Sequence, residues 1–294
     1  ARALEREVKK LPTLRGRTVV NLFYESSTRT SSSFELAAKR LSADVVSVKA
    51  AGSSVDKGES LKDTIRTLNA YRPNIIVIRH PHIGAAHLTA RWSDAHVVNA
   101  GDGKHQHPTQ CLLDLYTIRK RLGRLKDVKV AIVGDILHSR VARSDIEGFR
   151  MMGLDVTLVG PPALIPPGIA EATGARVADD PEAMSEADVI YVLRMQHERM
   201  EPGQNFVPTL AEYARTWGVS ASRVRPGQVV MHPGPMNRGV EIAPDVADSA
   251  ASLVEDQVEA GLVVRMAVLY DLMTRPGMGT VTDIRERTGE WGAA

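Results

Sequence analysis

Short apolar runs alternate with longer amphipathic segments along most of this chain, and this alternation limits the folds that it can adopt. The runs lie at 18–24, 45–48, 75–78 and 97–100 in the first half and at 128–133, 156–159, 175–177, 188–193 and 228–231 in the second. Most have the length and β-branched content of buried strands, and most of the segments between them have the length of helices. Strands that alternate with helices are typical of parallel βαβ units. The sequence therefore predicts an α/β protein with two three-layer αβα domains, each built on a parallel sheet.

The division of the chain follows from its length and from one well-delimited helix. A chain of 294 residues exceeds what a single core usually supports. Segment 108–122 begins with proline and is followed by Gly123, which is the usual asymmetry of a helix. We predict a first domain over 1–123 and a second domain over 124–252.

A second long helix is predicted over 253–273. Its apolar face is formed by Val254, Val258, Leu262, Met266, Leu269 and Met273. Such a helix can complete the first domain and, with helix 108–122, cross between the two domains. The remaining residues, 274–294, are predicted to form a loosely held tail because they mix charge with Pro and Gly.

Composition excludes several classes of protein. The chain has no uninterrupted apolar run of membrane-spanning length, and its start is charged rather than signal-like. The single cysteine, Cys111, excludes an intrachain disulfide and is expected to pack in a helix. A net charge of +2 and 4% aromatic residues do not suit a nucleic-acid surface. We expect a soluble cytoplasmic protein with no membrane or nucleic-acid partner, whose natural N-terminus is missing because the first motif comes so early.

The turn Ser-Ser-Thr-Arg-Thr at 26–30 separates the first predicted strand from the first predicted helix. The first backbone N–H groups of a helix lack intrahelical partners, and the helix dipole favours an anion there. Arg29 can add a forked, charge-assisted contact to the same anion. The alternative is that these hydroxyls only cap the helix. We predict a phosphate site at this turn.

Four more cationic residues follow strands or lie on loops. Lys57 lies on a Gly/Ser-rich loop and Arg79 follows strand 75–78, whereas Arg140 and Arg194 lie in the second half. One such arginine would usually be a surface charge, but together with Arg29 the set indicates a polyanionic ligand. We expect the first half to bind a phosphate and the second half to bind carboxylates.

The remaining motifs concern two candidate site residues, His107 and Gln110, and the possible cofactors. His107 is a candidate hydrogen-bond donor or proton carrier, with Gln110 one helical turn later. His105 and His107 lack the acidic or histidine partners of a metal site, so no metal is expected. The Gly/Ser-rich loop at 52–59 lacks the order of a nucleotide P-loop, and Gly134 is not followed by the glycines of a dinucleotide fingerprint. We therefore expect no cofactor.

Three motifs together resemble the carbamoyltransferase family. They are Ser-Thr-Arg-Thr at 27–30, Arg-His-Pro at 79–81 and His-Pro-Thr-Gln at 107–110, and the match runs in order from about residue 10 to residue 273. Within the family, Arg-Met-Gln at 194–196 and His-Pro-Gly-Pro at 232–235 resemble the members that use L-aspartate. The resemblance implies a transferase that converts carbamoyl phosphate and L-aspartate into N-carbamoyl-L-aspartate and phosphate, in de novo pyrimidine (UMP) biosynthesis.

The resemblance also implies that residues 1–123 form a carbamoyl-phosphate-binding domain and residues 124–252 an aspartate-binding domain, and it implies roles for individual residues. Carbamoyl phosphate would be bound by Ser27, Thr28, Arg29, Thr30, Ser53, Lys57, Arg79, His107, Gln110, Pro233 and Gly234. Of these, Thr30, Arg79 and His107 would donate to the carbamoyl oxygen, and Lys57 would complete the catalytic set. Gln110 and the carbonyls of Pro233 and Gly234 would hold the carbamoyl NH₂. Aspartate would be bound by Lys57, Arg140, Arg194 and Gln196.

The assembly implied by the resemblance is a homotrimer with active sites shared between subunits. Ser53 and Lys57 would then reach into the neighbouring subunit's site. Whether a regulatory chain or a dihydroorotase joins the trimer is left open. Ser31 departs from the family, which often has arginine after the position of Thr30.

Three other functions remain as alternatives. An ornithine-using relative is expected to have His-Cys-Leu-Pro where this chain has His-Pro-Gly-Pro at 232–235, and Arg194 would repel its ammonium group. A non-catalytic anion-binding or assembly protein would have no need of His107 and Gln110. A dehydrogenase would need the missing glycine fingerprint.

Overall fold

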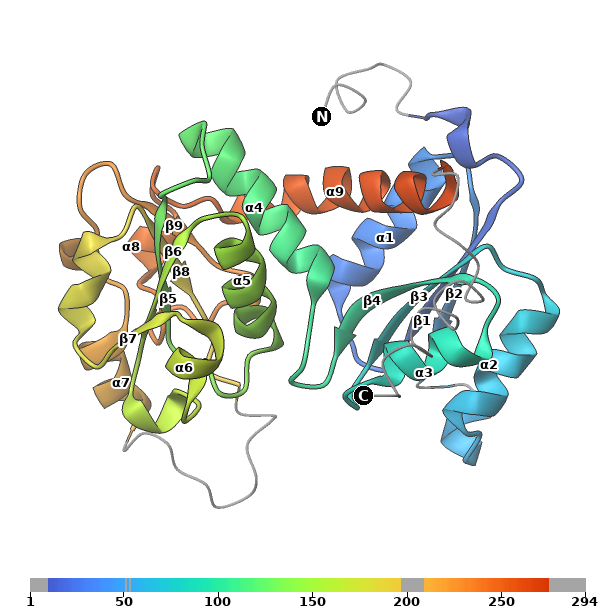
Figure 1. The fold of residues 1–294 in the computed structure, drawn as a ribbon, viewed down its shortest axis with the longest axis horizontal. Coiled ribbons are helices and arrows are strands. Elements are labelled where there is room, and N and C mark those ends of the chain that lie inside the picture. Colours follow the sequence, from blue (N-terminus) through green and yellow to red (C-terminus); the bar gives the residue numbers. More distant parts are fainter. Residues whose placement is uncertain (1–9, 51, 53, 197–208, 275–294) are drawn as a thin grey trace, which may run out of the picture. The chain divides into compact units, whose positions relative to one another are not determined.

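The computed structural model of the chain is shown in Figure 1 and describes residues 10–50, 52, 54–196 and 209–274. Ser53 and the predicted tail after Thr274 lie outside the described residues. The described residues up to Gly103, together with those from Gly261 onward, form one compact unit, and Lys104–Ala260 form the other. Within the described part of the chain, no helix combines the length and the apolar character needed to cross a bilayer.

The first unit contains a parallel sheet of order β2-β1-β3-β4. Its strands are β1 (Thr18–Phe23), β2 (Asp44–Lys49), β3 (Ile75–His80) and β4 (His96–Asp102), and its helices are α1 (Thr28–Arg40), α2 (Leu61–Ala70), α3 (Ala85–Trp92) and the later part of α9 (Val254–Thr274). Side chains alternate across β1: Val19 packs in one core cluster with Phe34 of α1 and Leu269 of α9, and Val20 packs in another with Ile65 of α2. The sheet is therefore covered by helices on both faces.

The second unit contains a parallel sheet of order β7-β6-β5-β8-β9. Its strands are β5 (Lys129–Val133), β6 (Asp155–Val159), β7 (Arg176–Ala178), β8 (Val189–Val192) and β9 (Val229–Met231), and its helices are α4 (Pro108–Leu122), α5 (Arg140–Met151), α6 (Ile169–Thr173), α7 (Leu210–Trp217) and α8 (Pro244–Ala247). Alternate residues of β5 again enter two clusters: Ile132 packs with Phe149 of α5, and Val133 packs with Val246 of α8. The predicted fold class, two α/β units on parallel sheets, is confirmed.

Short 3₁₀ segments connect the longer elements. They are Pro12–Leu14, Ser54–Lys57, Pro162–Leu164, Pro181–Glu186 and Ala221–Arg223. The helix predicted over 108–122 begins and ends where expected, with Gly123 in the left-handed conformation (φ 73°) after its last residue. Contacts group this helix with the second unit, whereas the predicted boundary at residue 123 assigned it to the first domain.

The apolar face predicted for α9 is wrong at one position. Val258 is 52% exposed, whereas Gln257 and Arg265 are almost completely buried. Both polar side chains have hydrogen-bond partners that the helix periodicity alone does not show: Gln257 donates to Asp114, and Arg265 donates to Ser33. Which side chains of α9 are buried therefore depends on their hydrogen-bond partners as well as on the spacing of apolar residues.

Both sheets have a point at which the strand order reverses. It lies between β1 and β3 in the first unit and between β5 and β8 in the second. In open α/β sheets, ligands bind outside the carboxyl ends of the strands at this point. These two edges are therefore the first places to look for the predicted site residues.

Candidate functional site

The predicted phosphate turn follows β1 and forms the start of α1. Ser27 is the N-cap residue, with extended backbone (φ −158°, ψ 91°), yet among the described residues its hydroxyl accepts no bond from the N–H groups of the helix. Thr28 and Arg29 are exposed and Thr30 is buried. The described first turn contains no acidic side chain that would oppose an anion. Capping by Ser27 therefore does not explain the hydroxyl-rich turn, and an anion remains the better explanation.

Arg79 lies at the carboxyl end of the neighbouring strand. It pairs with Phe23 in the sheet register, and its Nε donates to Glu25 Oε2 at 3.2 Å. Its Nη1 also donates to the carbonyl of Ala100 at 3.4 Å. These contacts hold the guanidinium beside the loop that leads to the phosphate turn.

Lys57, the third predicted cationic ligand of the first unit besides Arg29 and Arg79, ends the 3₁₀ segment Ser54–Lys57 that comes after β2. Its side chain is exposed. The preceding loop is closed by the Asp56 carboxylate, which accepts from the N–H of Gly52 at 2.6 Å. Ser53, predicted to act beside it, lies outside the described residues.

In the second unit, Arg140 is the first residue of α5 and is only 3% exposed. The helix start is capped by Ser139, whose hydroxyl accepts from the N–H of Ala142 at 3.1 Å. Gly134, which directly follows β5, has φ +117° and approaches the segment after β8 so closely that a Cβ would lie 2.8 Å from the carbonyl oxygen of Leu193. The glycine thus lets the chain leave β5 directly beside the segment that carries Arg194.

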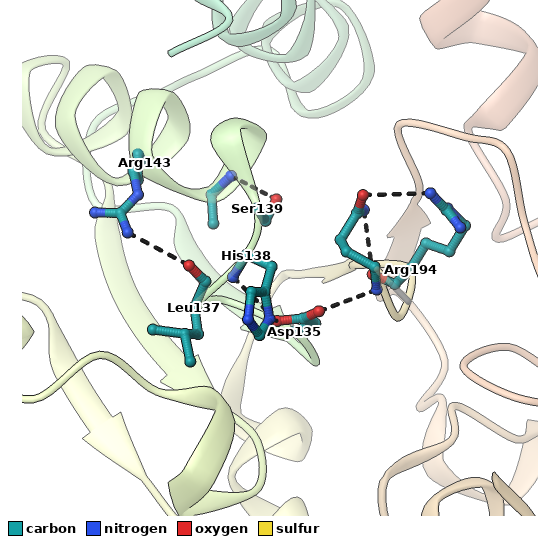
Figure 2. Close-up of polar contacts among 8 residues, drawn as sticks. Asp135, Leu137, His138, Ser139, Arg143 and Arg194 are labelled. Carbon is teal, nitrogen blue, oxygen red and sulfur yellow. Dashed lines mark hydrogen bonds and ion pairs between the residues drawn. The ribbon is translucent and has the colours of Figure 1, made fainter. Parts of the chain in front are cut away.

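Asp135 joins these two segments, as Figure 2 shows. It is completely buried; its Oδ1 accepts from the backbone N–H of His138 at 3.1 Å and lies 2.9 Å from His138 Nδ1. Its Oδ2 accepts from the N–H of Gln196 at 3.0 Å, and Gln196 Oε1 accepts from Arg194 at 3.2 Å. Asp135 and His138 were not predicted from the sequence, although an acid directly after a strand-ending glycine was a usable signal.

His107 and Gln110 lie at the start of α4 and are both buried. The N–H of His107 donates to Ser144 Oγ on α5 at 2.7 Å, so the start of α4 is fixed to the helix that begins with Arg140. Gln110 Nε2 lies 3.2 and 3.1 Å from the two carboxylate oxygens of Asp114. The backbone of His107 is therefore fixed by α5, and the side chain of Gln110 is fixed by Asp114.

The loop after β9 contains the last two predicted ligands, Pro233 and Gly234. The N–H of Gly234 donates to His232 Nδ1 at 2.8 Å, and His232 Nε2 lies 3.2 Å from Glu241 Oε1. Because β9 is the neighbour of β8, this loop lies at the same sheet edge as Arg194. The structure thus brings three of the predicted aspartate ligands, Arg140, Arg194 and Gln196, and the loop 232–235 to one edge of the second sheet, whereas Lys57 lies in the first unit.

Two carboxyl groups, Asp114 of α4 and Asp145 of α5, are fully buried. Burial first, and then the negative charge of Asp114, raise the pKa of Asp145 well above its usual range. Asp114 accepts from three donors, which favours the charged form of this carboxyl group. Among the described residues, no three His, Cys, Asp or Glu side chains are placed to hold a metal ion.

Family models match nearly the whole chain. The model described as "Aspartate/ornithine carbamoyltransferase, carbamoyl-P binding domain" matches residues 1–120, and the one described as "Aspartate/ornithine carbamoyltransferase, Asp/Orn binding domain" matches residues 126–272. The order of the two matches agrees with the predicted order of a phosphate-binding and a carboxylate-binding half.

Individual relatives agree with these matches. The chain is 59% identical to the aspartate carbamoyltransferase catalytic subunit of Pelotomaculum thermopropionicum, over 93% of this chain and 89% of the relative. Among solved structures it is similar to the catalytic subunit of M. Jannaschii aspartate transcarbamoylase, with 37% identity, a TM-score of 0.80 and coverage of 92% of this chain and 90% of that chain. It is also similar to the Trypanosoma cruzi enzyme in complex with carbamoyl phosphate and aspartate, with 32% identity, a TM-score of 0.81 and coverage of 92% and 89%. The chain belongs to the aspartate/ornithine carbamoyltransferase family.

Proposed function

We propose that this chain transfers the carbamoyl group of carbamoyl phosphate to L-aspartate, giving N-carbamoyl-L-aspartate and phosphate for pyrimidine synthesis. The observation that carries the choice of aspartate is the position of Arg140 and Arg194 at the reversal point of the second sheet. Two guanidinium groups suit a substrate with two carboxylates, because each can bind a carboxylate through two parallel hydrogen bonds. Ornithine has only one carboxylate, and its side chain ends in an ammonium group, so the second arginine would have no carboxylate to bind.

The first unit supplies the ligands of the phosphate. The hydroxyls of Ser27, Thr28 and Thr30, the first N–H groups of α1 and the Arg29 guanidinium bind its oxygens. As the carbamoyl carbon becomes tetrahedral, its oxygen gains negative charge. Arg79, Thr30 and His107 donate to this oxygen, and each such donor is worth about 10² to 10³ in rate.

The second unit supplies the ligands of the carbamoyl NH₂ and of aspartate. Gln110 and the carbonyls of Pro233 and Gly234 accept from the NH₂ group. Arg140 binds the α-carboxylate and Arg194, with Gln196, binds the β-carboxylate. Gln196 is already within hydrogen-bond distance of Arg194, so the two ligands of the β-carboxylate form one preorganised group.

The reaction needs no covalent enzyme intermediate. The neutral aspartate amine attacks the carbamoyl carbon, a C–N bond forms, and the C–O bond to phosphate breaks as the tetrahedral intermediate collapses. The phosphate leaves with that bonding pair and takes up the proton that the amine loses. Positioning and charge stabilisation therefore account for the catalysis.

The working form is proposed to be a cytoplasmic homotrimer in which Ser53 and Lys57 act in the neighbouring subunit's site. Exposure of Lys57 supports this, because within the described residues its side chain is not committed to an ion pair. The name catalytic subunit, carried by the Pelotomaculum relative, also fits an assembly. Inactive monomers at high dilution, with activity restored on concentration, are the expected result.

The test is formation of the ureido product from carbamoyl phosphate with L-aspartate and, separately, with L-ornithine. Turnover with aspartate alone is expected. Turnover with ornithine would overturn the assignment of Arg194 to a substrate carboxylate. Binding of carbamoyl phosphate with no turnover of either amino acid would favour the non-catalytic alternative.

A further inference from the structure

Asp114 is the centre of a buried hydrogen-bond network that the proposed reaction does not use directly. It lies one turn after Gln110 on α4 and is completely buried. Tyr191 Oη donates to its Oδ2 at 2.7 Å, and Gln257 Nε2 donates to its Oδ1 at 2.7 Å. Gln110 Nε2 lies within 3.2 Å of both oxygens. One carboxylate therefore accepts from three different elements: α4, β8 and α9.

The chemistry of a carboxylate fixes the direction of the Gln110 amide. An ionised carboxylate only accepts hydrogen bonds, so the amide must turn its NH₂ group toward Asp114. The carbonyl oxygen of Gln110 then faces away from Asp114. In this orientation the residue offers an acceptor, and not a donor, to a ligand.

Gln257 connects Asp114 to the loop after β9 through hydrogen bonds of fixed direction. Its Nε2 donates to Asp114, so its Oε1 is free to accept, and it accepts from the N–H of His232 at 2.9 Å. His232 in turn accepts from the N–H of Gly234. The direction of the loop backbone at 232–234 is thus connected to Asp114 by a chain of hydrogen bonds with one consistent polarity.

We propose that Asp114 and Gln257 are positioning residues that make the site selective for a substrate NH₂ group. They direct three acceptors toward it: the Gln110 side-chain carbonyl and the backbone carbonyls of Pro233 and Gly234. The inference rests on the proposed function. Acceptors in fixed directions favour a carbamoyl group over an acetyl group of the same shape, because a methyl group leaves them unpaired.

The matched variants are Asp114→Asn, Gln257→Met and Tyr191→Phe, each studied in the full chain. Asparagine keeps the shape of Asp114 but offers an NH₂ group to donors, so that the Gln110 amide is no longer held in one direction. Methionine removes both bonds of Gln257 while keeping an unbranched helix-compatible side chain. Phenylalanine is the comparison: it also removes one donor from Asp114, and because the Tyr191 hydroxyl interacts with Gln110 as well, it leaves only the Gln257 connection to the loop 232–235 unchanged.

The measurements are KM and kcat for carbamoyl phosphate, the inhibition constant of acetyl phosphate, and the melting temperature. We expect Asp114→Asn and Gln257→Met to reduce the preference for carbamoyl over acetyl phosphate at least about tenfold, which corresponds to about 1.4 kcal/mol. Tyr191→Phe should lower the melting temperature and reduce this preference less than Asp114→Asn does, because Gln110 and Gln257 still donate to Asp114.

Equal weakening of both phosphates, or an unchanged preference in folded Asp114→Asn and Gln257→Met, would overturn the inference and leave a purely structural network. If Asp114→Asn does not fold, the preference measured for Gln257→Met alone tests the positioning role. Wild-type protein that turns over carbamoyl phosphate but lacks the preference contradicts only the positioning role. Wild-type protein that neither binds nor turns over carbamoyl phosphate contradicts the proposed function itself, and the inference with it.

Discussion

The two units present their candidate ligands in opposite ways. In the first, Thr28, Arg29 and Lys57 are exposed, and the anion site depends on the start of one helix. In the second, Arg140 and Gln110 are buried, and hydrogen bonds through Asp135 and Asp114 fix their surroundings. A phosphate needs many donors, which a helix start supplies from its backbone. A small group with few atoms needs side chains in fixed directions, and these require a buried supporting network.

This contrast predicts that substitutions of ligands in the first unit change activity without changing stability. Substitutions of ligands in the second unit should change both. Removing an exposed ligand leaves few folded-state contacts to lose. Removing a buried polar ligand leaves its former partners unsatisfied, which costs about 1–3 kcal/mol for each. Five substitutions, the last two of them a pair, test the comparison.

Arg29→Ala should have the largest effect on activity. Loss of two charge-assisted bonds, each worth about 1.5–3 kcal/mol, predicts a fall in kcat/KM of at least about 10². The melting temperature should stay unchanged because Arg29 is exposed. Steady-state kinetics and thermal denaturation measure the two effects, with Arg66→Ala on α2, also exposed, as the control. Near-normal turnover would remove the phosphate assignment from this turn.

Arg140→Ala should lower both activity and stability. The KM for aspartate should rise about 10²-fold, and the free energy of unfolding should fall by about 1–3 kcal/mol because the side chain is 3% exposed. Denaturant titration and aspartate kinetics measure these changes. Arg150→Ala, an exposed arginine of the same helix, should change neither strongly. If Arg140→Ala affects activity without affecting stability, the second unit does not differ from the first.

Asp145→Asn should change the pH dependence of stability. The folded protein keeps the Asp145 proton to a higher pH than the unfolded chain, whose aspartates release theirs near about 3.9. Stability from this group is therefore complete below that pH and is lost as the pH rises toward the folded pKa, with a slope of at most about 1.4 kcal/mol per pH unit. The variant should lack this decline in chemical denaturation measured across pH. Equal slopes for the two proteins would mean that Asp145 is ionised in the folded state.

A pair of serines at helix starts should show the smallest effects and the clearest contrast. Ser139 caps α5 through the N–H of Ala142, whereas the Ser27 hydroxyl makes no such bond to the described residues of α1. Ser139→Ala should reduce the free energy of unfolding by about 1 kcal/mol. Ser27→Ala should reduce it much less and should instead raise the KM for carbamoyl phosphate. Equal losses of stability would show that both serines act as caps.

The sequence was sufficient for the order of elements because its signals are local. Pro108 and Gly123 delimit α4, and β-branched runs mark the buried strands. The carboxyl ends of strands also located Arg79 and Arg194, since a parallel sheet brings such ends to one edge.

The supporting residues were missed because their partners lie far away in the chain. Gln257 and Asp114 are 143 positions apart, and neither shows by its spacing that it is buried against the other. The same contact explains the error at Val258: helical periodicity indicated an apolar face, but the polar neighbour, Gln257, is the residue that is buried.

The division of α9 between the two units has a consequence for the order in which the chain folds during synthesis. Met266 and Leu269 belong to the core cluster of the first unit, together with Val19 and Phe34 from its beginning. The ribosome releases these two residues only after all of Lys104–Ala260 has been made. Domains generally fold as units while the chain emerges. The second unit therefore has all of its residues available first, and the unit that begins the chain is the last to complete its core.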